Sequence, residues 1–240
     1  MIVLGIESAT AQVGCALGGY EGVIASCHVG RGRRHAEILT PAVAFVCEQA
    51  GVDLSEVGAI AVDMGPGLFT GLRVGVATGK AFAQALRVPM VGLSSLDLLA
   101  YPVRFTRRLI AAVIDARRGE VFVALYRHVP GGVQRITEPA VATAEQVAVE
   151  LEARGEETLL VGDGAIRYAS VFAGISHVEA ASFGTAHPSA ASLVELAQPK
   201  VQREEFVQPW ELEPLYLRQA DVDPAWDRRL VPYRPDIGGG

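Results

Sequence analysis

The sequence predicts an α/β protein made of two duplicated lobes, each with a mixed five-stranded sheet flanked by helices. Three observations support this. A strand and a hairpin open the chain at residues 2–29, and a similar unit begins about a hundred residues later, a spacing that suits a duplicated domain rather than a solenoid. Strands alternate with helices after each hairpin, which favours a mixed sheet. Half of the 240 residues are hydrophobic, enough for a core in each lobe.

The first lobe is expected over residues 1–102. Apolar runs predict strands at 2–6, 13–17 and 22–29, and Gly18 and Gly19 mark the hairpin between the last two. Apolar residues at helical spacing predict a helix over 34–50, with Gly51 as its C-cap. The lobe is completed by a strand at 59–64, a helix at 70–87, a strand at 89–93 and a short helix that Ser94 and Ser95 can cap.

The second lobe is expected over residues 103–220 and repeats this order. Strands are predicted at 109–115, 120–128 and 133–137, followed by a helix that Thr143 caps and that ends near Gly155. A strand at 158–161, a short helix at 166–172, a strand at 177–179 and a helix at 189–198 come next. Residues 221–240 contain several prolines and end in three glycines, which predicts a loose tail.

The charge balance disfavours a protein that binds nucleic acid by itself. The formal net charge is −6, whereas neutralisation of phosphates by lysine and arginine supplies most nucleic-acid affinity. The basic clusters are short and are interpreted as solvated surface. They are Arg31, Arg33 and Arg34, and Arg104, Arg107 and Arg108. Any RNA contact is therefore expected to be shared with a partner.

The cysteines and the N-terminus indicate a cytoplasmic protein. Cys15, Cys27 and Cys47 are odd in number and lack metal-ligand spacing, so they are expected to be reduced thiols. The N-terminus enters a strand without a positively charged segment, unlike a signal peptide. No apolar run reaches the ~18 residues that span a bilayer.

The sharpest local feature is the glycine-rich turn at residues 65–71, between a predicted strand and a helix. A helix N-terminus at the carboxyl end of a strand offers free N–H groups to an anion. Gly65 and Gly67 would let the backbone approach closely, and Thr70 can cap the helix. A tight turn without a ligand explains the same residues equally well. The turn is not a Walker A loop, because Lys80 lies inside the helix and Ala81 follows it.

The helix after this turn carries one face of small residues, Gly71, Gly75, Gly79 and Ala83, at four-residue spacing. Glycine inside a helix costs about 1 kcal/mol relative to alanine, so this stripe needs a reason. Close approach of another backbone is the usual reason. The partner could be the protein's own sheet or first helix, or it could be another subunit.

A second candidate site lies at the first hairpin. Glu7 and Thr10 supply the carboxylate and hydroxyl that a nucleotide site needs, although a polar turn explains them equally well. Asp115 holds the equivalent place in the second lobe. There, Arg117 and Arg118 stand where a phosphate-binding hairpin requires glycine and hydroxyl groups. Since a nucleotide must be clamped by both lobes, this weakens an ATPase interpretation.

The histidines do not predict a metal or hydrolase site. His35, His177 and His187 lack a second histidine at helical ligand spacing, and no G-x-S-x-G motif marks a nucleophilic serine. Each is interpreted as a surface or hydrogen-bonded core residue.

Five segments together resemble the TsaB family, formerly called YeaZ. They are residues 6–10 (IESAT), 34–37 (RHAE), 61–75 (AVDMGPGLFTGLRVG), 93–96 (LSSL) and 214–218 (PLYLR). The resemblance is strong over residues 1–100 and weak beyond about 130, and the GPG-x-[FY]-TG-x-R-x-G string is specific to TsaB and its paralogue TsaD. It implies an actin-like ATPase (ASKHA, ribonuclease H-like) fold. It also implies a role in making N6-threonylcarbamoyladenosine at position 37 of tRNAs that read ANN codons.

The resemblance further implies a non-catalytic subunit without metal or cofactor. In TsaD, a helix after the fifth strand carries H-x-x-x-H metal ligands, and the matching positions here are Ser95 and Leu99. The implied partners are a TsaD-like catalytic subunit and a TsaE-like ATPase, with tRNA reached only through the complex and a homodimer formed by the chain alone. One departure is Glu7, where the family more often has aspartate, and it leaves residual nucleotide binding open.

The site residues follow from this resemblance. Residual nucleotide binding is assigned to Glu7, Thr10, Gly65, Gly67 and Thr70. The partner-binding helices carry His35, Ile38, Leu39, Ala42, Phe45, Gly71, Arg73, Val74, Gly75, Thr78, Gly79 and Phe82. The alternative function is a stand-alone actin-fold ATPase or a glycoprotease-like metallohydrolase.

Overall fold

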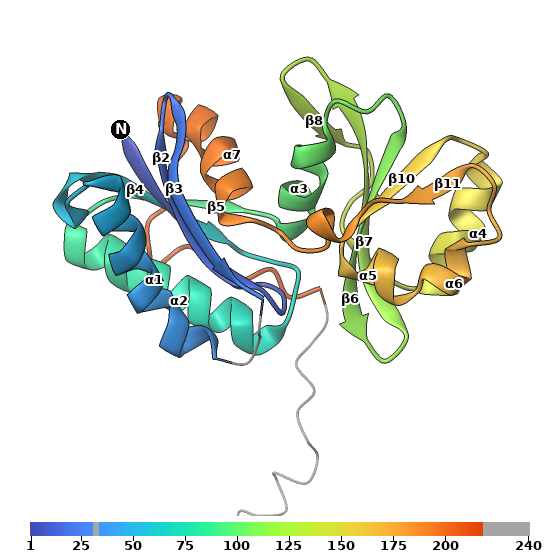
Figure 1. The fold of residues 1–240 in the computed structure, drawn as a ribbon, viewed down its shortest axis with the longest axis horizontal. Helices are drawn as coiled ribbons and strands as arrows, with labels where there is room; N and C mark the ends of the chain where they lie inside the picture. The colour runs from blue at the N-terminus through green and yellow to red at the C-terminus, as the bar shows by residue number, and fades with distance from the viewer. Residues whose placement is uncertain (31–33, 218–240) are drawn as a thin grey trace, which may run out of the picture.

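The computed structural model describes residues 1–30 and 34–217, and it has two sheet-centred lobes side by side (Figure 1). The predicted loose tail at 221–240 lies outside the described residues, as do Arg31 and Arg33 of the first basic cluster. Within the described residues, no helix is both long and apolar enough to cross a lipid bilayer.

The first sheet has five strands in the order β3-β2-β1-β4-β5, and it is mixed as predicted. The three hairpin strands are antiparallel, whereas β4 and β5 join β1 in parallel. The strands are β1 (Ile2–Glu7), β2 (Val13–Gly19), β3 (Gly22–Val29), β4 (Val57–Asp63) and β5 (Met90–Leu93). Because β1 and β4 are parallel neighbours, their carboxyl ends meet at one edge.

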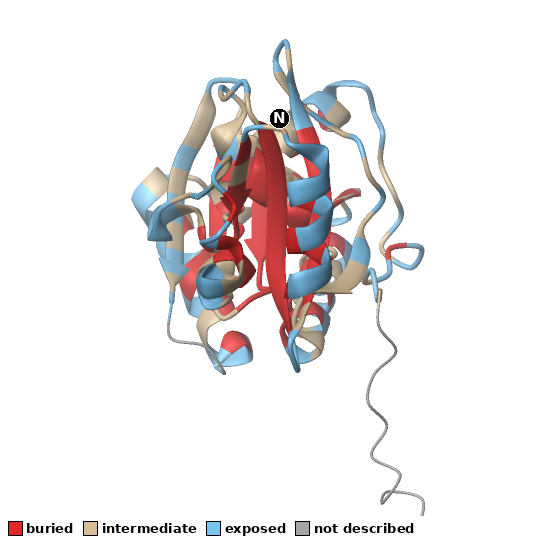
Figure 2. Cartoon of the chain, turned by 90° about the vertical axis from the view of Figure 1, so that its right-hand side faces the viewer, coloured by how far each residue is buried: buried red, intermediate tan, exposed pale blue. Residues whose placement is uncertain are grey.

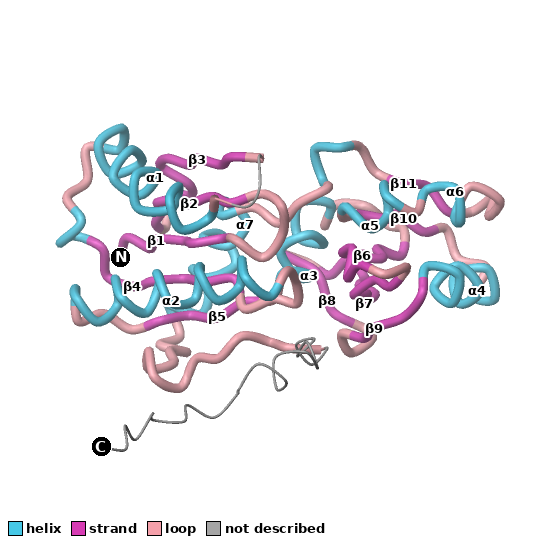
Figure 3. The backbone as a smooth tube through the Cα atoms, turned by 90° about the horizontal axis from the view of Figure 1, so that it is seen from below, coloured by secondary structure: helices cyan, strands magenta, loops and turns pink. Residues whose placement is uncertain are grey.

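Two helices cover one face of this sheet, α1 (His35–Ala50) and α2 (Phe69–Leu86) (Figures 1 and 3). Both lie within one residue of the predicted ranges. Gly51 ends α1 in the left-handed conformation, with φ of 62°, which confirms it as the C-cap. The apolar side chains of the hairpin strands and of β4 interlock with α1 and α2 in one core.

The opposite face is covered by α7 (Ala190–Gln202), which comes from the far end of the chain. Glycines make room for it. A Cβ on Gly5 would lie 2.9 Å from Val194 Cγ2, and one on Gly18 would lie 2.6 Å from Val194 Cγ1. The sequence prediction places this helix within the second lobe, at 103–220, whereas it packs on the first sheet. The lobe boundary at residue 102 stays a prediction, and α7, which follows it in the sequence, packs on the first lobe.

The segment after α7 covers the β5 edge of the same sheet (Figure 3). Val207 exchanges two backbone hydrogen bonds with Met90, at 2.9 and 3.1 Å. Leu212 is buried in the first core, and the Leu215 N–H donates to the Met64 carbonyl at 2.7 Å. This edge is thereby paired rather than left open.

The second sheet has six strands, one more than predicted, in the order β11-β10-β6-β7-β8 with β9 also paired to β7. The extra strand β9 forms because residues 140–143 run antiparallel to the first half of β7, beyond the end of β8. The strands are β6 (Leu109–Arg117), β7 (Glu120–Val129), β8 (Gly132–Arg135), β9 (Ala140–Thr143), β10 (Thr158–Val161) and β11 (Val178–Ala180).

Short helices surround the second sheet and fill the junction. They are α4 (Ala144–Arg154), α5 (Asp163–Arg167) and α6 (Ala169–Phe172), with 3-10 turns at Tyr101–Val103 and Phe183–Thr185. A further 3-10 turn, Leu54–Glu56, precedes β4 in the first lobe. Helix α3 (Ser95–Ala100) lies between the two sheets, where Leu96, Leu99 and Ala100 join the core of the second one and Leu98 packs with the first sheet and α7. The central strands of the second lobe are buried along most of their length (Figure 2).

Candidate functional site

The glycine-rich turn is held tightly against the first hairpin. The Leu68 N–H donates to the Ala9 carbonyl at 2.7 Å, and the Ser95 N–H donates to the Gly65 carbonyl at 2.9 Å. A Cβ on Gly67 would lie 2.2 Å from the Ala9 oxygen, so only glycine fits there. The contact with the protein's own hairpin therefore explains the close approach that the glycines permit.

Two buried carboxyl groups meet behind this turn, Glu7 at the end of β1 and Asp63 at the end of β4. Glu7 is 0% exposed and Asp63 is 2% exposed. The Ala9 N–H donates to Glu7 Oε1 at 2.8 Å. Asp63 Oδ1 accepts from the Gly65 N–H at 2.7 Å and from Ser95 Oγ at 2.6 Å. The other oxygens, Glu7 Oε2 and Asp63 Oδ2, are buried without a hydrogen-bond partner.

The electrostatics of this pair favour protonation. Burial raises the pKa of Asp63 to about 7, against two hydrogen bonds that lower it. Burial, and then the nearby charge of Asp63, raise the pKa of Glu7 well above its ordinary value. Two carboxylates in one dry site cannot both ionise cheaply, so the pair retains a proton near neutral pH.

The remaining polar groups of the hairpin are turned toward the protein itself. Ser8 Oγ donates to the Gly71 carbonyl at 2.8 Å, and His35 Nε2 lies 3.0 Å from the Thr10 carbonyl oxygen. Thr10 is 1% exposed, whereas Thr70 is exposed at the start of α2. The expectation that Thr70 caps α2 is wrong, because the N-cap is Leu68 and no side chain caps the helix. The N–H groups in the first turn of α2 therefore have no side-chain cap and can bind a ligand.

A cavity of about 680 Å³ opens beside this N-terminus, between the lobes. Its lining residues are Ala11, His35, Leu68, Phe69, Thr70 and Gly71 from the first lobe and Arg117 from the second. The five residues predicted for nucleotide binding thus gather around one hairpin, but Thr70 alone among them lines this cavity. A free helix N-terminus opposite a guanidinium is chemically suited to an anion.

In the second lobe, the buried carboxylate of Asp115 is paired with two arginine side chains. Asp115 Oδ2 lies 2.9 Å from Arg117 Nη1 and 3.4 Å from Arg167 Nε. Its Oδ1 accepts from the Arg117 N–H at 2.9 Å and from the Tyr168 hydroxyl at 3.1 Å. The Asp115 N–H donates to Asp163 Oδ1. Burial raises the pKa of Asp163, so this second carboxyl group, next to Asp115, is protonated at a higher pH than an exposed aspartate.

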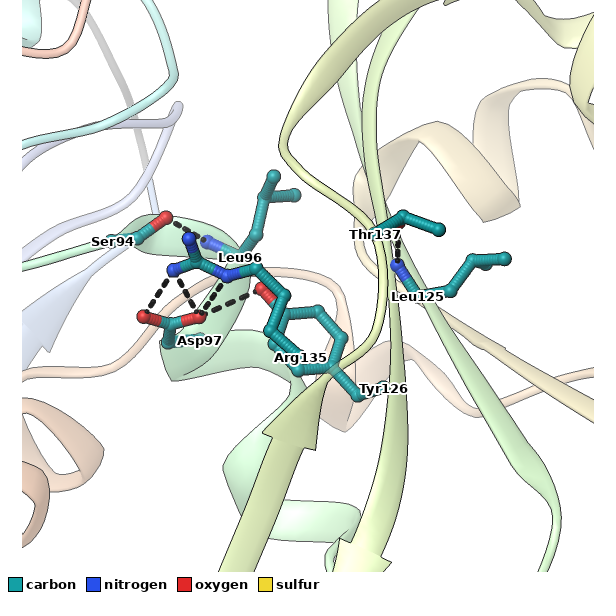
Figure 4. A network of polar contacts seen from close by, with 7 residues as sticks. All are labelled: Ser94, Leu96, Asp97, Leu125, Tyr126, Arg135 and Thr137. Carbon is teal, nitrogen blue, oxygen red and sulfur yellow. Dashed lines mark hydrogen bonds and ion pairs between the residues drawn. The ribbon is translucent and has the colours of Figure 1, made fainter.

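Helix α3 ties the lobes together on the other side of the junction (Figure 4). Asp97 accepts a bidentate pair from Arg135, with both Nη2–oxygen distances at 2.7 Å, and a hydrogen bond from the Tyr126 hydroxyl at 2.8 Å. The two positions matching the paralogue's metal ligands lie on this helix. Ser95 is 0% exposed and donates to Asp63, and Leu99 is 1% exposed in the second core.

Within the described residues, no group of three or more histidine, cysteine, aspartate or glutamate side chains could hold a metal ion. His187 has a buried Nδ1 without a partner, and burial lowers its pKa against the charge of Asp163.

The small-residue stripe of α2 faces the protein's own sheet, so its prediction as a surface for another subunit is wrong. A Cβ on Gly71 would lie 2.2 Å from the Ser8 carbonyl oxygen, one on Gly75 2.1 Å from Ser8 Oγ, and one on Gly79 2.3 Å from Val62 Cγ1. Of the other interface candidates, three residues of α1 are also buried. They are His35, Leu39 and Ala42.

The outward side of α1 and α2 carries the rest of the predicted interface residues. Phe45 is 50% exposed and Arg73 is exposed. Arg73 lies over the Phe69 ring at 3.9 Å and donates to the Tyr216 hydroxyl at 3.2 Å. The half-buried residues are Ile38, Val74, Thr78 and Phe82.

Sequence reasoning missed Asp63 as the partner of Glu7 and Arg117 as a cavity residue. Asp63 carried a usable signal, since it is a charged residue that closes an otherwise apolar strand. Arg117 was noted only as an obstacle to phosphate binding, whereas it faces the cavity.

Comparisons with known proteins agree with this architecture. A family model described as "TsaD: tRNA N6-adenosine threonylcarbamoyltransferase" matches residues 30–226. The Escherichia coli protein named tRNA threonylcarbamoyladenosine biosynthesis protein TsaB is 32% identical over 168 residues, 68% of this chain and 72% of that protein. The Haemophilus influenzae TsaB is 30% identical over 194 residues, 78% of this chain and 80% of that protein.

The solved structure of YeaZ from Pseudomonas aeruginosa superposes with a TM-score of 0.78 at 31% identity, covering 90% of this chain and 99% of that one. Other relatives are longer than the region they share. The chain spans 56% of an uncharacterized Mycobacterium leprae protein and 59% of the Bacillus subtilis TsaB. The predicted α/β, actin-like fold is confirmed by the topology and this superposition. The chain belongs to the TsaB (YeaZ) family, whose paralogue is TsaD.

Proposed function

We propose that this chain is a non-catalytic subunit in the biosynthesis of threonylcarbamoyladenosine in tRNA. It pairs with a TsaD-like catalytic subunit and a TsaE-like ATPase, and the complex transfers the threonylcarbamoyl group to N6 of adenosine 37 in tRNAs reading ANN codons. The names of the E. coli and H. influenzae relatives support the pathway. The chain works in the cytoplasm and forms a homodimer when it is alone.

The observation that carries the non-catalytic role is the burial of Ser95 and Leu99. A metal ligand must expose a lone pair toward a cavity that substrate can reach. Ser95 is instead committed to Asp63, and Leu99 is packed in the core. The neutralised Asp115 adds support, since its acceptor sites are filled by the protein's own arginines and Tyr168.

The partner surface in this proposal is the outward side of α1 and α2, without the glycine stripe. Phe45 is half-exposed there, and Ile38, Val74 and Phe82 on the same two helices are half-buried. Large apolar residues in such a patch are typical of interfaces between subunits. Residual nucleotide binding is proposed only for the cavity at the α2 N-terminus, through Thr70 and Arg117.

Reconstitution tests the proposal. The chain is combined with TsaD-like and TsaE-like subunits, ATP, threonylcarbamoyl donor and unmodified tRNA, and the modified nucleoside is measured by mass spectrometry. Modification should require this chain, although the chain alone should neither modify tRNA nor hydrolyse ATP. Micromolar Mg-ATP binding with turnover by the isolated chain would instead favour the stand-alone ATPase. Peptide or glycoprotein cleavage would favour the hydrolase.

The partner surface has its own test. Phe45→Glu should weaken binding to the TsaD-like subunit at least tenfold, because it replaces a large exposed apolar side chain of the proposed surface by a charge. Phe183→Glu is the matched control, since Phe183 is 80% exposed on the second lobe. Equal affinity for both variants, in proteins with unchanged melting temperature, would rule out this surface.

A further inference from the structure

A second cavity lies at the opposite end of α2 from the interlobe site. It has a volume of about 550 Å³ and opens between the last turns of α2 and the segment that follows α7. The lining residues are Lys80, Ala83, Gln84, Arg87, Val88, Pro89, Gln208, Pro209 and Trp210. Two cations, two amides and one tryptophan line it, and no acidic side chain does. This size and composition suit a ligand that combines a flat ring with negative charge.

Trp210 is unusually exposed for such a large side chain, at 74%. Its backbone is nevertheless fixed on both sides. Val207 is paired with Met90, and Leu212 is 2% exposed in the first core. Between them, the Glu211 N–H donates to the Gln208 carbonyl at 3.0 Å, and the Gln208 N–H donates to Glu211 Oε2 at 3.1 Å. The indole is therefore presented to solvent on an anchored turn, at little ordering cost to a ligand.

The two cations beside Trp210 have no ion-pair partner within the described residues. Among the described residues, neither Lys80 nor Arg87 forms an ion pair with a carboxylate. The nearby end of α7 differs, because Lys200 and Arg203 are both paired with Glu205. Unpaired cations next to an exposed indole stand out in a chain whose formal net charge is −6.

We propose that this cavity binds a single-stranded segment of RNA. One base stacks on Trp210, phosphates contact Lys80 and Arg87, and the amides of Gln84 and Gln208 face the base edge. An aromatic platform within a basic groove is the usual means of holding single-stranded nucleic acid. That the RNA is the tRNA substrate rests on the proposed function. The site then gives this subunit a direct contact with tRNA, on the face of the lobe away from the second sheet.

The number of phosphate contacts sets the expected salt dependence of RNA binding. Two phosphate contacts to a single strand give a slope of about −1.4 for log affinity against log salt. A contact of this size is weak by itself and acts through the added affinity of the whole complex.

Tryptophan fluorescence provides the test in the full-length chain. The protein has two tryptophans, so Trp226→Phe leaves Trp210 as the reporter. Titration with tRNA and with oligouridylate should quench Trp210 saturably, with a salt slope of about −1.4. Lys80→Gln or Arg87→Gln should each reduce the slope by about 0.7, whereas Lys200→Gln should not change it. Trp210→Ala, measured by filter binding, should lower affinity about fivefold or more, the lower bound for a base stack.

Three outcomes would overturn the proposal: no quenching, slopes insensitive to Lys80 and Arg87, or adenosine monophosphate bound as tightly as the oligonucleotide. The last result would make this a mononucleotide site. Failure of the RNA-site proposal can be told apart from failure of the proposed function. If tRNA modification still requires the chain while Trp210 never senses RNA, only the RNA site is lost.

Discussion

The two lobes treat equivalent carboxylates in opposite ways. In the first lobe, Glu7 and Asp63 lie in a dry site, each with one oxygen lacking a partner, and burial raises the pKa of both groups. In the second lobe, Asp115 is surrounded by Arg117 and Arg167 and has its oxygens filled. The charge of the carboxyl groups is therefore offset by bound protons in the first lobe and by guanidinium groups in the second.

This difference shows two ways in which carboxyl groups beside the interlobe junction can be kept from carrying a free charge. A nucleotide clamp needs charged groups from both lobes that remain free for phosphate and its cation. Here, Glu7 accepts a hydrogen bond from within its own hairpin, and Asp63 accepts from the glycine-rich turn and from Ser95. In the second lobe, Asp115 is paired with arginines of that lobe. The first arrangement depends on tight packing and on pH, whereas the second depends on salt.

The largest expected effect concerns the packing of the first lobe. Gly75→Leu should lower the free energy of unfolding by about 3–5 kcal/mol or prevent folding, because a Cβ there would lie 2.1 Å from Ser8 Oγ. Urea unfolding measures it, with Ala77→Leu on the exposed side of α2 as the control. A Gly75→Leu protein as stable as the control would mean that α2 does not hold the hairpin.

The next effect is the pH dependence of the carboxyl pair. An acid whose pKa is raised on folding stabilises the native state fully below its unfolded pKa, near 4, and this stabilisation is lost as pH rises through about 7. Asp63→Asn removes this titration, and its amide can donate toward Glu7. The variant should lose the part of this decline that Asp63 contributes, whereas Glu7, whose pKa is raised chiefly by burial, keeps its own part. At pH 8 the variant should be roughly 2–4 kcal/mol more stable than the parent.

Chemical denaturation across this pH range checks the prediction. Asp53→Asn is a control of opposite sign, since hydrogen bonds from Ser55 lower the pKa of the exposed Asp53. If the parent protein showed no decline between pH 4 and 7, the pair would not hold its proton in the way described.

The smallest effect belongs to the second lobe. Asp115→Asn should cost only about 1 kcal/mol, because Arg117 and Arg167 are 53% and 56% exposed and water compensates them. The cost should shrink further in 1 M salt. Glu150→Gln, which breaks the exposed pair with Arg154, is the control and should change stability by less than about 0.5 kcal/mol. A salt-independent loss above about 3 kcal/mol would contradict the contrast between the lobes.

Much of the fold was predictable because its signals are local. The periodicity of α1 and α2 and the glycines at the hairpin depend on neighbouring residues, and the structure confirms them. The apolar face of α7 predicted that it would pack, but not on which sheet. Its contact with β2 joins residues 180 positions apart, where Gln198 donates to the Gly18 carbonyl, and no local pattern encodes that choice.

The site was harder to predict for a similar reason. The sequence indicated that Glu7 and the glycine-rich turn were special, but the pairing of Glu7 with Asp63 requires that β1 and β4 be neighbours. For the glycine stripe, the pattern left two partners open. Only the distances from Gly71 and Gly75 to Ser8 decided between them, in favour of the protein's own hairpin.

The return of the chain to its first sheet has a consequence for synthesis on the ribosome. Val3, Ala16 and Ala59 are covered by α7, and Met90 is paired with Val207. The lobe that emerges first therefore cannot complete its core until nearly the whole chain has been translated. A nascent chain stopped before residue 190 would expose one apolar sheet face and one open strand edge, the features that chaperones bind and aggregates grow from.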